Sequence, residues 1–160
     1  ITYKTAVLLG CSLQMGAICA NATSENQKHI YEFGKNIGIA FQILDDVLDV
    51  YADDEKFGKQ VGGDIISNKK TFLLLKAFEL ANPLQKEELH KLLQVTSDSL
   101  NDKVAKVTAI YNQLNIKQIA ISEADKFTNI ALEHLSKIYA NAEKIENLRT
   151  FALQLLNRQM

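Results

Sequence analysis

The sequence predicts an all-α fold, a helical bundle, from its composition and its periodicity. Seven glycines and one proline in 160 residues are too few for the many tight turns that sheet proteins need. Apolar residues recur at spacings of three and four, as on one face of a helix, most clearly between residues 25 and 51. Hydrophobic residues make up 47% of the chain and charged residues 23%, which is typical of a globular domain with its own core.

The predicted helices can be placed in order along the chain. Residues 2–21 are rich in Ala, Leu and Gly, with Lys4 as the only charge, which is typical of a helix buried on most sides. Ser24 is a candidate N-cap for a long helix over 25–51. Helix resumes near Ser67 and continues to about residue 80. Four further helices are predicted: over residues 84–94, from just after Thr96 or Ser97 to about residue 113, over 115–140 and over 142–157.

The segment 52–68 interrupts this pattern. It holds three of the seven glycines and shows no helical period, so we expect a long loop, and loops of this length are often functional. Elsewhere the connections are short, with Asn82 before Pro83 and Asn141 as candidate N-caps. Because there is no internal repeat or linker, residues 1–160 are predicted to form a single unit.

The net charge and the cysteines argue against some classes of protein. The net charge is −1, so there is no electrostatic basis for binding nucleic acid, and no apolar run is long enough to span a membrane. Cys11 and Cys19 would be roughly 12 Å apart on a helix, too far for a disulfide, and buried thiols of this kind are expected in the reducing cytoplasm. The histidines lack metal-ligand spacing and are predicted at the surface: His29, His90 and His134.

The strongest functional signal is a cluster of aspartates in the long predicted helix. Asp45 and Asp49 are four residues apart and share a helical face, and Asp46 lies about 100° round from Asp45. Like charges this close repel one another, more so among apolar neighbours, and a hard divalent cation removes the repulsion. Oxygen ligands alone suit Mg2+ or Ca2+. A solvated acidic face is the alternative, because short acidic motifs are common.

Positive charges stand on both sides of this cluster in the sequence. Downstream, Lys59 lies in the glycine-rich segment and Lys69 follows it. Upstream, Lys4 and Thr5 stand in a nearly apolar helix, where a lysine is costly unless it reaches solvent or an anion. Cations, backbone amides and a magnesium site together match the needs of a diphosphate ligand.

In this order the motifs resemble the C-terminal half of the trans-type polyprenyl diphosphate synthases. The matching pattern is Lys4-Thr5-Ala6, then Phe41-Gln42-x-x-Asp45-Asp46-x-x-Asp49, then Gly58-Lys59-x-x-Gly62-x-Asp64 with Lys69 and Thr71. By motif it runs from residue 1 to about residue 76. The resemblance implies that residues 1–160 are the C-terminal half of an all-helical isoprenoid synthase fold.

The resemblance also implies three groups of site residues. The family's second aspartate-rich motif binds magnesium that bridges to an allylic diphosphate, and it corresponds here to Asp45, Asp46 and Asp49. The residues expected to contact the same diphosphate are Lys4, Lys59 and Lys69. Thr5 and Gln42 are expected beside the reacting prenyl group, with Lys4, as catalytic residues. Asp64 matches a loop aspartate that either acts directly or orders the loop.

The implied reaction is a magnesium-dependent prenyl transfer of isoprenoid biosynthesis. An allylic diphosphate loses its diphosphate group, isopentenyl diphosphate attacks the resulting cation, and a proton is lost. Members of the family are commonly homodimers, so a second copy of the chain is the expected protein partner.

One half of the family's magnesium clamp is absent from these residues. The first aspartate-rich motif should precede Lys4 on an earlier helix, so we expect the 160 residues alone to be inactive. Two other hypotheses stay open. The chain could be a truncated, non-catalytic homologue that regulates or partners an active synthase, or it could belong to a terpene cyclase or head-to-head synthase of the same fold. The glycine–lysine segment after Asp49 favours chain elongation over cyclisation.

Overall fold

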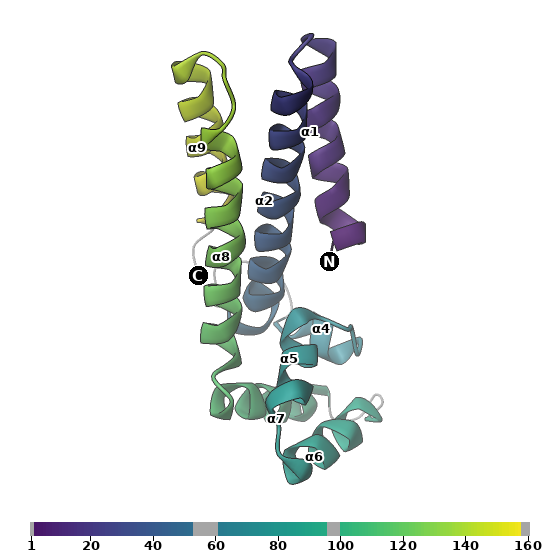
Figure 1. Ribbon diagram of the computed structural model, residues 1–160. Helices are drawn as coiled ribbons and strands as arrows, with labels where there is room; N and C mark the ends of the chain where they lie inside the picture. Colours follow the sequence, from purple (N-terminus) through teal and green to yellow (C-terminus); the bar gives the residue numbers. More distant parts are fainter. Residues whose placement is uncertain (1, 53–60, 96–99, 158–160) are drawn as a thin grey trace. The chain divides into compact units, whose positions relative to one another are not determined.

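The structure is a computed structural model that describes residues 2–52, 61–95 and 100–157. It confirms the all-α prediction, because the regular elements in these ranges are all helices (Figure 1). In chain order they are a π-helical turn η1 (Thr2–Ala6), α1 (Val7–Cys19), α2 (Ser24–Tyr51), α4 (Gly63–Ile66), α5 (Phe72–Leu80), α6 (Pro83–Leu93), α7 (Leu100–Gln113), α8 (Ile116–Ser136) and α9 (Ala142–Leu156).

The chain divides into two compact units. The first contains the residues up to Leu44 and those from Ser122 onward, and the second contains Asp45–Ile121. Helix α2 therefore begins in the first unit and ends in the second. The assignment of residues 1–160 to one half of a larger domain stays a prediction.

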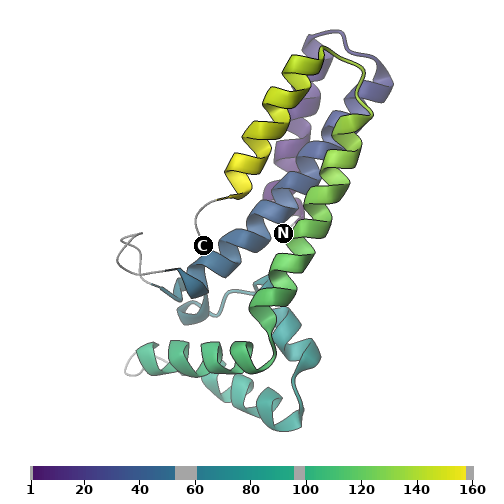
Figure 2. The ribbon, with the colours of Figure 1, turned by 90° about the vertical axis from the view of Figure 1, so that its left-hand side faces the viewer.

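In the first unit, α1, most of α2, α8 and α9 lie side by side (Figure 2). Residues of α2, α8 and α9 form its buried centre: Phe33, Ile37, Ala131, Leu135 and Ala152. Helices α2 and α8 are also joined through His29 and His134, whose Nδ1 atoms are 2.9 Å apart. Both histidines are half-buried rather than at the surface as predicted. The imidazole pair therefore adds a polar contact to a mainly apolar interface.

The turn η1 lies close against α2 because Gly38 has no side chain. A Cβ atom at this position would lie 2.7 Å from the Cα atom of Ala6, which is fully buried. The close approach places Thr5 against α2, where its hydroxyl donates a hydrogen bond of 3.0 Å to Oε1 of Gln42.

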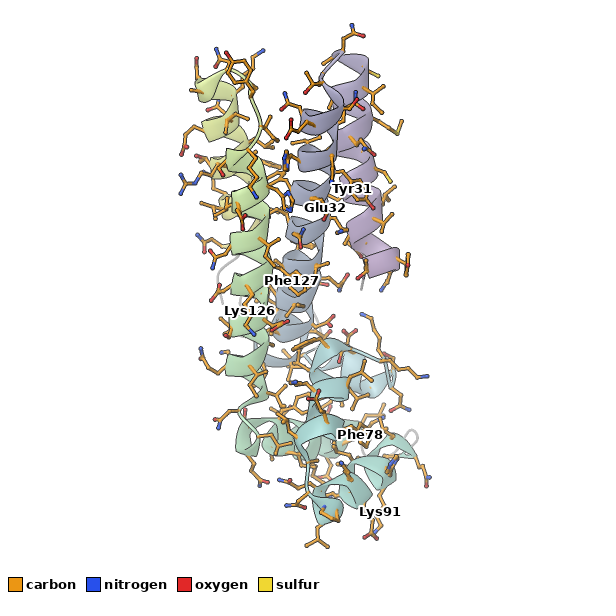
Figure 3. All side chains as sticks on the ribbon, in the orientation of Figure 1. Tyr31, Glu32, Phe78, Lys91, Lys126 and Phe127 are labelled. Carbon is orange, nitrogen blue, oxygen red and sulfur yellow. The ribbon has the colours of Figure 1, made fainter. Side chains whose placement is uncertain are left out.

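Helix α7 is the centre of the second unit. It contacts α4, α5 and α6, and its apolar stripe includes the buried Val107, Ile110 and Tyr111. Phe78 of α5, labelled in Figure 3, stacks against His90 of α6 with ring centroids 4.9 Å apart. The short helices around α7 thus share one core.

Two of the predicted helix caps are confirmed. Asn82 and Gln85 form a reciprocal capping box at the start of α6, with Pro83 as the first helical residue. Asn141 accepts a hydrogen bond from the Lys144 N–H and so caps α9.

The start of α2 differs from the prediction. Ser24 is already the first helical residue, and Thr23 is the residue whose hydroxyl accepts a hydrogen bond, from the Asn26 N–H. Serine and threonine stand side by side here, so composition could not distinguish the cap from the first helical residue.

The predicted loop 52–68 contains a helix, α4, and the next helix, α5, begins at Phe72 rather than near Ser67. Asn68 has a φ of +53°, which ends the helical geometry between them. Residues 53–60 lie outside the described part of the chain. The glycines at 62 and 63 are turn and helix-start residues, not signs of a structureless segment.

Three helices end in the same way. Two residues after the last residue of α1, α4 and α7, the chain has an asparagine with a left-handed backbone: Asn21, Asn68 and Asn115, with φ of 53°, 53° and 54°. This position most often holds glycine, and asparagine is the usual substitute. The low glycine content of the chain is therefore compatible with its many helix ends.

The cysteines only partly match the prediction. Both are free, but Cys11 is half-buried and Cys19 is exposed, so the prediction of two buried thiols is wrong for Cys19. None of the helices in the described ranges has the length and apolar character needed to cross a membrane.

Candidate functional site

The three aspartates of α2 have different surroundings. Asp45 is exposed, Asp49 is half-buried, and Asp46 is only 3% exposed. Asp45 and Asp49 are one helical turn apart on one face of α2. A cation arriving from solvent can therefore reach Asp45 directly, whereas protein encloses Asp46.

Asp46 binds the first turn of α5. Its Oδ2 accepts a hydrogen bond of 3.1 Å from the N–H of Phe72, the first residue of that helix. Thr71 is the N-cap, and its hydroxyl accepts a hydrogen bond of 3.2 Å from the Leu74 N–H. Unpaired amides and the helix dipole stabilise a negative charge at this end of a helix. Asp46 thus fixes the start of α5 to α2, a role that the sequence did not reveal.

Asp49, Asp64 and Lys69 form a chain of polar contacts. The backbone N–H of Asp64 donates to Oδ2 of Asp49 at 2.9 Å, and Nζ of Lys69 lies 2.7 Å from Oδ1 of Asp64. The peptide N–H of Gly62 also donates to the Asp49 carbonyl oxygen at 2.6 Å. The ordering role that was one of two possibilities for Asp64 therefore has a structural basis.

The surroundings of Asp49 disfavour the charged form of its carboxyl group. Burial raises the pKa of the Asp49 carboxyl above its ordinary 3.8, the hydrogen bond from Asp64 opposes this, and the charges of Asp64 and Asp45 add to it. The hydrogen bond to Asp64 raises the pKa of Lys69, and the charges of Asp46 and Asp49 do so too. Lys69 therefore stays protonated within the field of the carboxylates.

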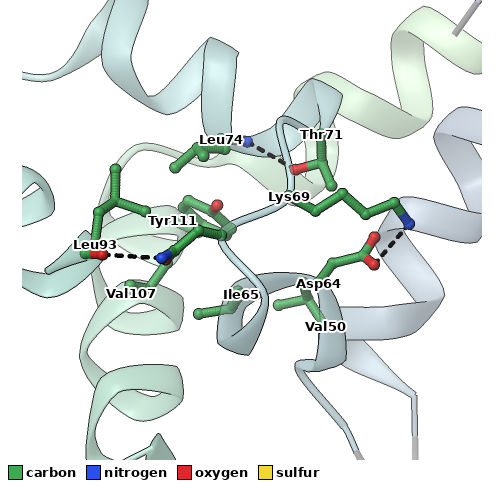
Figure 4. Close-up of a pocket in the computed structure, with 10 residues that line it drawn as sticks. Val50, Asp64, Ile65, Lys69, Thr71, Leu74, Leu93, Val107 and Tyr111 are labelled. Atoms are coloured by element: carbon green, nitrogen blue, oxygen red, sulfur yellow. Dashed lines mark hydrogen bonds and ion pairs between the residues drawn. The ribbon is translucent and has the colours of Figure 1, made fainter. Parts of the chain in front are cut away.

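A small cavity of about 10 Å³ lies beside these residues in the second unit (Figure 4). Asp64, Lys69 and Thr71 line it on one side, and Val107 and Tyr111 of α7 line it on another. Burial raises the pKa of the Tyr111 hydroxyl well above its ordinary 10, and nearby negative charges add to this. Tyr111 is therefore neutral, and its hydroxyl is hydrogen-bonded to the side chain of the cap residue Thr71.

In the first unit, the structure brings together two of the predicted catalytic residues. Thr5 and Gln42 share the hydrogen bond described above, and Gln42 is 9% exposed. Lys4, which directly precedes Thr5, is exposed. The catalytic roles of Lys4, Thr5 and Gln42 stay predictions, as does the diphosphate contact of Lys59, which lies outside the described residues.

The donor set fits a metal that is shared with a phosphate. Asp45 and Asp49 offer oxygen atoms only, as Mg2+ prefers. Within the described ranges, no group of three or more His, Cys, Asp or Glu side chains could hold a metal ion. Mg2+ characteristically uses one or two carboxylates and completes its shell with waters and substrate phosphates, and two carboxylates on one helical face are compatible with such a site.

Sequence reasoning missed three residues that support the site. Tyr111 backs Thr71, while Asn68 and Lys103 hold the turn between α4 and α5. A signal was present for Lys103, which stands four residues before Val107 on the apolar stripe of α7. A charged residue at a core position of this kind is worth attention because it must have a partner.

Residues 1–114 match the polyprenyl synthetase family. The chain is 30% identical over 154 residues to a geranylgeranyl diphosphate synthase of Saccharolobus solfataricus, covering 96% of this chain and 46% of that protein. It is 35% identical over 129 residues to heptaprenyl diphosphate synthase component 2 of Bacillus subtilis, covering 78% and 36%.

A crystal structure of a geranylgeranyl pyrophosphate synthase has the same fold. It superposes with a TM-score of 0.89 at 38% identity, covering all of this chain and 50% of that one. The chain thus spans about half the length of the relatives that it matches. The family match covers most of the chain and includes the aspartates of α2 and the Asp64–Lys69 pair. The chain therefore belongs to the polyprenyl synthetase family.

Proposed function

We propose that this chain forms part of a prenyltransferase that condenses an allylic diphosphate with isopentenyl diphosphate. One observation carries the proposal. Exposed Asp45 and half-buried Asp49 share a face of α2, while Lys69 is held in their field through Asp64. Two carboxylates and an ammonium group in one place suit a metal diphosphate, and family membership supports that ligand.

The residues of this chain would bind and orient the leaving group. Asp45 would ligate Mg2+ directly, with Asp49 and Asp46 contributing from positions nearer the protein interior. When bound, Mg2+ supplies positive charge that stabilises the diphosphate as it leaves. Lys69 and Lys4 would contact phosphate oxygens, and the same role is proposed for Lys59. In the absence of a ligand, Lys69 keeps its charge paired with Asp64.

The hydroxyl of Thr5 and the amide of Gln42 would act on the prenyl group. Each residue fixes the orientation of the other through their hydrogen bond. An oriented dipole stabilises a developing positive charge without having to reorganise. The proposed role is therefore to steady the allylic cation until the double bond of isopentenyl diphosphate attacks it.

These residues supply one part of the machinery. The relatives are about twice as long as this chain. We propose that the remaining part of the fold supplies a second set of metal ligands and the groups that hold isopentenyl diphosphate, so that residues 1–160 alone are inactive. Assembly as a homodimer and a location in the cytoplasm are further parts of the proposal.

The test uses the full-length protein with an allylic diphosphate, isopentenyl diphosphate and Mg2+, and measures chain-extended products by mass spectrometry. Asp45→Asn should lower kcat/KM by about 100-fold or more, the typical cost of losing one positioned electrostatic contact. Asp125→Asn, at an exposed aspartate of α8, is the matched control and should stay within about 2-fold of wild type. Undiminished product formation by Asp45→Asn, or in excess EDTA, would refute the proposal.

A second candidate function is that of one subunit in a two-chain synthase. It is favoured by the match to a protein named component 2 of a heptaprenyl diphosphate synthase. Here the chain would pair with a different polypeptide and either regulate it or complete its site. Native mass spectrometry of the protein from its source separates the two candidates. A complex that contains only one kind of polypeptide supports the first, and a complex with a different polypeptide supports the second.

A further inference from the structure

A lysine is buried in the second unit beside the proposed site. Lys103 of α7 is 1% exposed, although it carries an ammonium group. Its Nζ donates to Oδ1 of Asn68 at 2.7 Å and to the Ile66 carbonyl oxygen at 3.3 Å. Burying a charge is costly unless it gains strong contacts. Both of these acceptors are neutral oxygens, and burial lowers the pKa of Lys103 below its ordinary 10.5.

The two acceptors belong to the turn that joins α4 to α5. Asn68 has a φ of +53°, so the turn depends on a left-handed residue. The amide of Asn68 also donates to the Leu93 carbonyl oxygen at 2.9 Å, a contact drawn in Figure 4. The turn is therefore held from two sides, by the end of α6 and by the buried ammonium group of α7.

This turn lies between the two places where the chain meets the aspartates of α2. Before it, the Asp64 N–H donates to Asp49. After it, the Phe72 N–H donates to Asp46. Lys69 is the next residue after Asn68, and its backbone N–H donates to the Asp64 carbonyl oxygen at 2.9 Å. A shift of the turn would consequently move Lys69 relative to both carboxylates.

We infer that Lys103 and Asn68 are positioning residues that hold Lys69 in place for binding a metal diphosphate. The inference rests on the proposed function and adds a part that neither the motifs nor the family match assigns. A methionine or leucine at position 103 would pack without the desolvation cost of the ammonium group. The desolvation cost of Lys103 is offset by its hydrogen bonds to Asn68 and to the Ile66 carbonyl oxygen, which fix the turn directly before Lys69.

The test is a double-mutant cycle in the full-length protein, with inorganic pyrophosphate and Mg2+ as the probe and calorimetry as the measurement. Lys69→Met should weaken Mg2+-dependent binding about 10-fold, because it removes a charge-assisted contact. Lys103→Met should weaken it about 3- to 10-fold in wild type and by less than 2-fold in the Lys69→Met background, because both changes remove the same contact. Lys106→Met, at an exposed lysine one turn away in an ion pair with Asp102, should have no effect beyond 2-fold.

A second variant guards against loss of folding. Asn68→Gly removes the side-chain acceptor while keeping a residue that adopts positive φ without strain. It should show the same coupling to Lys69, with an unchanged far-ultraviolet circular dichroism spectrum. Equal losses in the wild-type and Lys69→Met backgrounds would show that Lys103 and Asn68 act independently of Lys69, which overturns the inference but leaves the proposed function intact. Failure of the wild-type protein to bind Mg2+ pyrophosphate would overturn both.

Discussion

The carboxylate of Asp49 accepts a hydrogen bond from the backbone N–H of Asp64 at 2.9 Å. The carbonyl oxygen of Asp49 accepts a second one, from Gly62. The end of α2 thus binds the backbone of the segment that contains Gly62 and Asp64 through two hydrogen bonds. A candidate metal ligand is at the same time an anchor for the segment that carries Lys69. The backbone at these two points is therefore as important for the site as the charged side chains.

Gly62 should tolerate no side chain. Its φ is +79°, and a Cβ atom would lie 2.6 Å from Cγ1 of Val104. Gly62→Ala should lower the free energy of unfolding by about 1–3 kcal/mol or more, from backbone strain and overlap. Gly16 is the control, because a Cβ atom at this helical position would meet no atom within 4 Å apart from its chain neighbours and the backbone of its own helix, so Gly16→Ala should stabilise by about 0.5–1 kcal/mol. Denaturant titration measures both, and equal effects at the two positions would contradict the structure.

Asp46 should matter for stability and Asp45 should not. Asp46→Ala leaves the partly buried N–H of Phe72 without this acceptor, which costs about 1–3 kcal/mol. Asp45→Ala changes an exposed position and should stay within about 0.5 kcal/mol of wild type. Urea unfolding of the metal-free protein is the measurement. A larger loss for Asp45→Ala than for Asp46→Ala would exclude the capping role of Asp46.

Thr71 should be replaceable by serine but not by alanine. Its hydroxyl caps α5 through the Leu74 N–H, and alanine at an N-cap costs about 1 kcal/mol. Thr71→Ser keeps the hydroxyl and should retain most of the stability, and the thermal midpoints of the two variants give the comparison. If serine and alanine destabilise equally, the methyl group rather than the hydroxyl is responsible.

The stability of the first unit should fall in mild acid because of His134. Burial holds the pKa of His134 below its ordinary 6.5, the charge of Glu32 opposes this, and His29 adds to it. Below pH 6.5 the unfolded chain therefore binds a proton at this residue that the folded chain does not, so stability declines as the pH falls from 6.5 towards the folded-state pKa.

Two variants test this pH dependence. His134→Gln should flatten the dependence of the unfolding midpoint between about pH 7.5 and 5.5, where few other groups titrate. His90→Gln, at an exposed histidine of α6, should keep the wild-type slope. A slope that His134→Gln leaves unchanged would assign the acid sensitivity to other groups.

Local sequence signals predicted most of the helices well. Apolar spacing identified the helices, and the order of motifs correctly indicated the family. Asp45 and Asp46 show what local sequence signals cannot predict. Helical geometry separates them by about 100°, but it cannot say which of them meets the start of α5. That depends on packing between segments 26 residues apart.

Long-range pairing explains the other differences. His29 and His134 are 105 residues apart in the chain, and no spacing rule connects them. Helix α4 was missed because its four residues are too few for a period to show. Lys103 can be recognised in the sequence as a charged residue on an apolar helical stripe, but its partner Asn68 lies outside that helix. For the histidine pair and for Lys103, the missing information is a contact between segments that are distant in the chain.

The left-handed asparagines at three helix ends indicate which substitutions these positions can accept during evolution. At each of these ends the backbone requires only a residue that adopts positive φ, and glycine does so equally well. At Asn68 the side chain also joins α6 and α7 through Leu93 and Lys103. Replacing asparagine by glycine would therefore preserve the backbone conformation at all three ends but would remove these side-chain contacts at position 68. Relatives with glycine at position 68 are therefore expected to carry a different residue at position 103.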